Sequence, residues 1–151
     1  MKILLYIVVL AATVLFPGKG TDVGKLIPVE VIAVSEDMGM ITVTTDTGDV
    51  GKGDNIAAAF LDLEDTAPGV IYLDTAEYLI LEQGTEKRIE ELRSYLKDNV
   101  RICYGEEGIT LDGIAAYLSV HKPDTKLNTV SDSGQIPVIY EENGRFRWIE
   151  K

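Results

Sequence analysis

The chain has 151 residues and carries 25 acidic against 14 basic side chains, which gives a formal net charge of −11 at pH 7. Such a charge repels nucleic-acid phosphate, so we expect no nucleic-acid binding. Cys103 is the only cysteine and His121 the only histidine. An internal disulfide and a His/Cys zinc cluster are therefore excluded, and we expect neither a cofactor nor a metal ion.

An apolar segment opens the sequence. From Ile3 to Phe16 the only strongly polar residue is Thr13, and a Pro-Gly-Lys sequence follows. This pattern is typical of the apolar region of a signal peptide. The run is short for a membrane span, which takes about 20 apolar residues, and no clear small-residue cleavage site follows it. Residues 1–16 are therefore predicted to be a signal peptide or a short membrane anchor, with a buried cytosolic helix as the remaining alternative.

Residues 17–25 are rich in glycine and charge and are predicted to be a linker. Residues 26–151 are then predicted to form one domain on the outer face of the cytoplasmic membrane, or a secreted one. Alternation of apolar and polar residues, or short apolar runs, indicate strands. In chain order, the predicted strands are residues 26–35, 40–45, 70–73, 78–81, 100–104, 136–140 and 145–149.

Helical periodicity indicates three helices between these strands. The first begins at a cap on Asp54 and runs to about Asp65, the second begins at Thr85 and runs to about Asp98, and the third begins at Thr110 and ends before Pro123. Turns at 36–39 and 143–144 close two hairpins. Because strands and helices alternate between flanking hairpins, we expect an α/β (α+β) fold with a mixed sheet.

The segment 46–54 is predicted to be a loop rich in glycine and aspartate. It lacks the order of a Walker phosphate loop and the spacing of an EF-hand, although a weak calcium site there stays an alternative. Loops on a rigid scaffold often carry recognition, and glycine allows a partner to approach closely. The candidate binding residues are Asp49, Gly51, Lys52, Gly53 and Asp54; a connecting loop without a role is the other interpretation.

Catalytic groups are sparse in this sequence. Cys103 and His121 could form a thiol pair, but Cys103 lies in an apolar strand, where a free cysteine is usually a core residue. His121 stands at a predicted helix end, where a cation complements the helix dipole. We therefore expect no catalytic residues and no enzyme. Two alternatives stay open: a cell-envelope hydrolase or transferase using an acidic pair such as Asp49 with Asp54, and a purely structural envelope protein.

Part of the sequence resembles the N-terminal domain of the Ger(x)C family, the C subunits of bacterial spore germinant receptors. The resemblance covers residues 48–105 and lies in the order of its turns and hydrophobic segments, Gly51–Leu63, Pro68–Leu73, Glu77–Leu81, Glu86–Asp98 and Asn99–Ile102. It implies a non-enzymatic accessory protein, outside the membrane, that acts with membrane protein partners in spore germination. Family members are longer and are anchored by an N-terminal cysteine, which this chain lacks.

Overall fold

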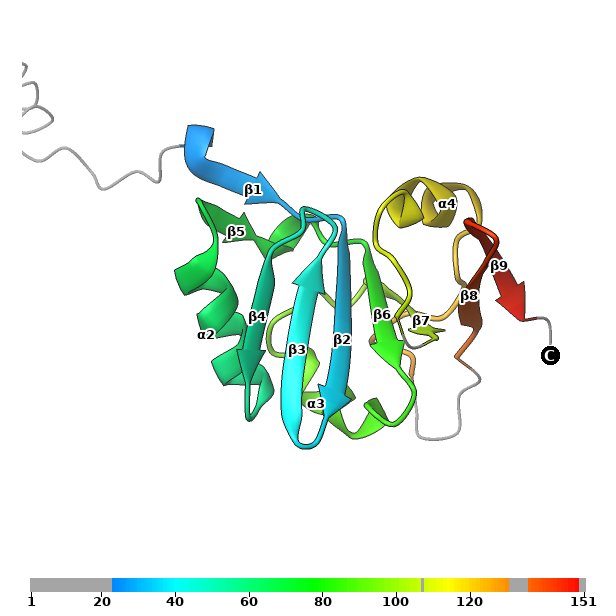
Figure 1. The fold of residues 1–151 in the computed structure, drawn as a ribbon, viewed down its shortest axis with the longest axis horizontal. Coiled ribbons are helices and arrows are strands. Elements are labelled where there is room, and N and C mark those ends of the chain that lie inside the picture. The colour runs from blue at the N-terminus through cyan, green and yellow to red at the C-terminus, as the bar shows by residue number, and fades with distance from the viewer. Residues whose placement is uncertain (1–22, 107, 131–135, 150–151) are drawn as a thin grey trace, which may run out of the picture.

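A computed structural model describes residues 23–106, 108–130 and 136–149 (Figure 1). The strands are β1 (Leu26–Pro28), β2 (Val31–Asp37), β3 (Met40–Thr45), β4 (Val50–Gly53), β5 (Val70–Tyr72), β6 (Tyr78–Glu82), β7 (Arg101–Gly105), β8 (Val138–Glu142) and β9 (Arg145–Ile149). The helices are α2 (Ile56–Thr66), α3 (Ile89–Leu92) and α4 (Ile114–Val120), with 3₁₀ turns η1 (Val23–Lys25), η2 (Leu73–Thr75) and η3 (Glu86–Arg88).

Seven strands form one mixed sheet in the order β4-β3-β2-β6-β7-β8-β9, and β1 pairs with β5 in a separate two-stranded sheet. Strands β2, β6, β7 and β8 run parallel to one another, so their carboxyl ends meet at one edge. The hairpins β2–β3 and β8–β9 are antiparallel. The predicted α/β (α+β) class with a mixed sheet and three helices is therefore confirmed.

Alternation along the strands divides the core between the two faces of the sheet. One face carries Ile32, Leu79 and Ile102 and is covered by α2 and α3. The opposite face carries Ile80 and Cys103, among others, and is covered by α4. The cluster under α4 contains no residue of β3 or β4, so this face of those two strands has no covering helix among the described residues (Figure 1).

The predicted loop at 46–53 is wrong over its second half, which forms the edge strand β4. Glycine is a poor strand former, so the pattern favoured a loop. The glycines are required in β4 because of packing. A Cβ at Gly51 would come within 2.2 Å of the Ala59 carbonyl oxygen, and one at Gly53 within 2.5 Å of the Ala59 nitrogen. Helix α2 therefore lies directly on the backbone of β4.

Several predicted boundaries also shift. The strand predicted at 26–35 is interrupted at Val29, whose backbone N–H and carbonyl both bond to the Thr75 hydroxyl at 3.0 Å. Asn55 rather than Asp54 caps α2, accepting from the Ala58 N–H. The side chain of Thr85 does not cap a helix. The helix predicted from Thr85 to about Asp98 is a 3₁₀ turn, η3, followed by the short helix α3, and the chain after Leu92 forms turns.

The third helix is shorter than predicted, because Gly113 rather than Thr110 precedes it. The Thr110 hydroxyl instead donates to the Glu141 carboxylate at 2.8 Å. The predicted signal peptide or anchor, residues 1–16, lies outside the described residues, as does the linker before Val23. In the part of the chain that is described, none of the helices has the length and apolar character required to span a membrane.

A charged cluster fastens η3 to the end of β2. The Glu36 carboxylate pairs with Arg88 Nε at 3.1 Å and with Lys87 Nζ at 3.0 Å. Arg88 also pairs with Glu91 at 2.8 Å. The hydrogen bonds from Arg88 and then Lys87 lower the pKa of Glu36 below its ordinary value.

We expect Gly51→Ala to destabilise the fold by about 1–3 kcal/mol, because the new methyl group would enter the backbone of α2. Lys52→Ala, on the neighbouring residue with an exposed side chain, should change the free energy of unfolding by less than about 0.5 kcal/mol. Chemical denaturation of the two variants measures the difference. Equal stabilities would contradict the close α2–β4 contact.

Replacing Glu36 by Gln should lower the melting temperature at neutral pH. The depressed folded pKa means that the ionised carboxylate stabilises the fold above the ordinary glutamate pKa of about 4.3. That contribution is lost as pH falls through the folded value, so the melting difference between wild type and variant should shrink below about pH 4. A difference independent of pH would show that the charge of Glu36 is not its cause.

Candidate functional site

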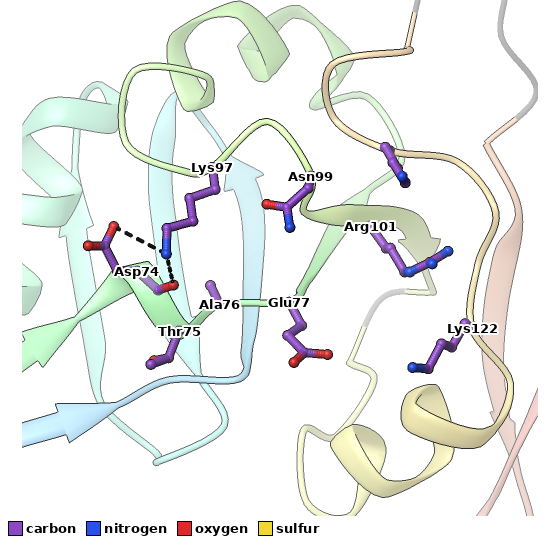
Figure 2. A pocket seen from close by; sticks show the side chains of 9 residues that line it. Asp74, Thr75, Ala76, Glu77, Lys97, Asn99, Arg101 and Lys122 are labelled. Carbon is purple, nitrogen blue, oxygen red and sulfur yellow. Dashed lines mark hydrogen bonds and ion pairs between the residues drawn. The ribbon is translucent and has the colours of Figure 1, made fainter.

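A basic pocket of about 520 Å³ opens at the amino ends of β6 and β7. Its basic side chains are Lys97, Arg101, Lys122 and Lys126, and two carboxylates, Asp74 and Glu77, share the lining. Figure 2 shows Lys97 turned toward Asp74 on one side of Glu77, and Arg101 and Lys122 on the other side. We call this hollow the basic pocket.

Three segments far apart in the sequence build the basic pocket. The approach to β6 supplies Asp74 to Glu77, and the turn after α3 supplies Lys97. Arg101 begins β7 and is aligned by its N–H, which donates to the Glu77 carbonyl at 2.8 Å. The chain after α4 then crosses below β7, where the backbone of Lys126 pairs with that of Arg101 in an isolated antiparallel β-bridge.

That crossing segment is held by backbone bonds on both sides of Lys126. The Ile102 N–H donates to the Thr125 carbonyl at 2.9 Å, and the Leu127 N–H donates to the Val100 carbonyl at 2.8 Å. Arg101 Nη1 also donates to the Pro123 carbonyl at 2.6 Å. The Lys122–Lys126 stretch is therefore fixed against β7, and the two lysines are presented on a rigid frame.

The cations of the basic pocket are only partly neutralised. Lys97 Nζ donates to the Asp74 carbonyl at 2.6 Å and lies 3.9 Å from its carboxylate. Among the described residues, the side chains of Lys122 and Lys126 make no ion pair. Four cations less two carboxylates leave a formal charge of +2 in the lining, within a chain of −11.

This arrangement is suited to holding an anionic group. Lysine ammonium groups and the remaining guanidinium N–H donors of Arg101 are all charged donors, which bind carboxylate and phosphate oxygens strongly. The Thr75 hydroxyl is already engaged, with Val29 at 3.0 Å and with the Tyr72 carbonyl at 2.8 Å. The lining thus offers electrostatic binding.

The predicted binding residues lie elsewhere, along β4 and its ends. Asp49 accepts from the Thr47 hydroxyl at 2.7 Å before the strand, and Asp54 accepts from the Asn55 amide at 2.8 Å after it. The Lys52 N–H donates to Asp62 at 2.8 Å. The close packing of Gly51 and Gly53 against α2 gives them a structural role; binding at these five residues stays a prediction.

Asp49 and Asp54 do not face each other across a site. The two residues flank the extended strand β4, and five residues of extended chain span roughly 16 Å. This exceeds the separation of about 5–9.5 Å that paired carboxylates take in glycoside hydrolysis. The described residues also contain no group of three or more His, Cys, Asp or Glu side chains that could hold a metal ion.

Cys103 and His121 occupy different environments. Cys103 is fully buried beneath α4, and burial raises the pKa of its thiol to about 12. His121 caps the exposed end of α4, where its ring lies 4.6 Å from that of Tyr117. The expectation of Cys103 as a core residue is confirmed.

Sequence reasoning did not identify the basic pocket. Its lysines are scattered among acidic residues and have no common spacing, because they converge only through the pairing of β7 with β6 and with the segment around Lys126. Only the Lys122–Lys126 pair, close in sequence and next to Pro123, was a local signal.

Comparisons with models of known protein families, with curated proteins and with solved structures found no match. The resemblance to the Ger(x)C family therefore stays a prediction that depends on the segments between residues 48 and 105.

We expect the Cys103 thiol to be unreactive in the folded protein. Reaction needs the thiolate, which a pKa of about 12 makes scarce at pH 8. A colourimetric thiol reagent should label Cys103 rapidly in denaturant and far more slowly under native conditions. Rapid native labelling would show an accessible thiol. His121→Ala should leave the native rate unchanged, whereas acceleration or loss of labelling would connect the two side chains.

Proposed function

We propose that this chain is a non-enzymatic interaction domain whose basic pocket receives an acidic group of a membrane protein partner. The observation that carries the proposal is the gathering of four cations around one hollow in a chain of net charge −11. Lys122 and Lys126 have no ion pair among the described residues, so both charges are available to a ligand.

The contrast between pocket and surroundings favours a specific contact. An acidic partner is repelled by most of a strongly acidic surface and attracted where Arg101, Lys122 and Lys126 lie. Such charge patterns guide association and suppress wrong orientations more than they add affinity. The frame of backbone bonds around Arg101 and Lys126 keeps the cations in place before the partner arrives.

The proposed location is the outer face of the cytoplasmic membrane. It is supported by the apolar segment Ile3–Phe16, which is typical of export, and by the resemblance to germinant-receptor C subunits. An accessory role in spore germination follows from that resemblance. The basic pocket adds a concrete contact site to this role, independent of the earlier candidate residues on β4.

Lys122→Gln with Lys126→Gln should weaken partner capture from membranes of the source organism about two- to thirty-fold. Each exposed ion pair contributes about 0.2–1 kcal/mol, and two are removed. Capture by the full-length wild type should also fall as salt is raised, since screening weakens exposed pairs. The measurement is the amount of partner that is recovered after cross-linking to each variant.

The matched control is Lys25→Gln with Lys52→Gln, which removes the same charge from exposed positions outside the pocket. Equal loss of capture in both double variants would reduce the effect to net charge. Loss in the control alone would move the contact to β4, where Lys52 was a candidate. Thermal melting of each variant shows whether folding is intact.

A further inference from the structure

A groove lies at the other end of the parallel strands, where their carboxyl ends meet. The chain leaves β6 toward η3 and α3, which pack on one face of the sheet. It leaves β7 through Ile109 and Leu111, which pack on the other face toward α4. Adjacent connections that diverge in this way open a crevice, the position where open α/β sheets commonly bind ligands.

The groove has a volume of about 340 Å³ and a largely apolar floor. Ala33 and Ser35 of β2 and Ile80 of β6 form the floor, and Ile109 with Leu111 forms a wall. A Cβ at Gly105 would lie 2.7 Å from Ile80 Cγ2 and 3.1 Å from Ile109 Cγ2. The wall is therefore packed down onto the floor, and the groove is already formed without a ligand.

Carboxylates supply the charge of this groove. Asp37, Glu82 and Glu106 line it, and a neighbouring hollow of about 500 Å³ shares Glu82, Gly105 and Glu106. No basic residue stands among the described residues that line either hollow, and none of the three carboxylates has an ion pair with a described residue. By contrast Glu36, the residue before Asp37, is neutralised by Arg88 and Lys87.

We propose that this groove is a second binding site, for a small aliphatic amine in its ammonium form. The apolar floor complements the aliphatic body, and the carboxylates at the rim complement the positive charge. Ligand pockets usually measure about 300–1,000 Å³, so the volume of the groove suits a small molecule. This proposal is independent of the basic pocket, which lies at the opposite ends of β6 and β7.

Titration of the full-length, isotope-labelled chain with hexylammonium tests the proposal. The amide signals of Ser35, Glu82, Gly105 and Leu111 should shift and saturate together. Hexanoate has the same aliphatic length with the opposite charge, and it should cause no saturable shift there. Absence of saturable binding by hexylammonium, or equal binding of hexanoate, would overturn the proposal.

Variants locate the binding. Glu82→Gln and Glu106→Gln should each weaken hexylammonium affinity about two- to five-fold, as expected for a partly exposed ion pair. Ser35→Phe should abolish binding by filling the groove while the remaining amide spectrum shows an intact fold. If Ser35→Phe perturbs folding, Ala33→Leu fills the same floor with a smaller change.

Glu64→Gln is the matched control, because it removes one carboxylate from the exposed surface of α2. It should leave the affinity unchanged, and a loss equal to that of Glu82→Gln would show diffuse attraction to an acidic surface and would refute the site. Lys122→Gln with Lys126→Gln should also leave amine binding unchanged. Failure of the amine site therefore does not affect the proposed role of the basic pocket.

Discussion

The structure depends on one topological constraint: the connections after β6 and β7 pack on opposite faces of the sheet. Helix α3 joins α2 over one face, whereas α4 covers the other. The divergence opens a groove where Glu82 ends β6 and Glu106 follows the end of β7. It also obliges the chain after α4 to return below β7, which brings Lys122 and Lys126 to the amino ends. Both hollows follow from this arrangement.

Charge is separated along the same parallel strands. Cations gather at the amino ends of β6 and β7, and carboxylates that have no ion pair with a described residue gather at the carboxyl ends. The net charge of −11 conceals this separation, because scattered residues such as Lys97 and Lys122 are far apart in the sequence. A domain with two ends of opposite charge has a preferred orientation toward a charged partner, since each end attracts what the other repels.

The sequence predicted the strands best where side chains alternate between two covered faces. Residues 78–81 were placed correctly within β6, and Asn143 with Gly144 correctly marked the last turn, where both residues have positive φ. Strand β4 was missed because glycines usually indicate a loop. The separation of β1 could not be predicted, since it depends on the long-range bonds between Thr75 and Val29.

The same distinction explains why the sequence indicated β4 as a candidate site and did not indicate the basic pocket. Gly51 and Gly53 have a local signature that resembles a flexible binding loop, yet the space beside each is filled by the backbone of α2. The basic pocket has almost no local signature, because its cations come from two segments that are far apart in the sequence, Lys97 and Arg101 around the start of β7 and Lys122 and Lys126 after α4. In β4 the glycines mark positions where another backbone packs closely. A binding pocket instead requires charged side chains that have no partner within the fold. Among the described residues Lys122 and Lys126 make no ion pair, and they reach the basic pocket only because the chain after α4 pairs with β7, a long-range contact that no local pattern indicates.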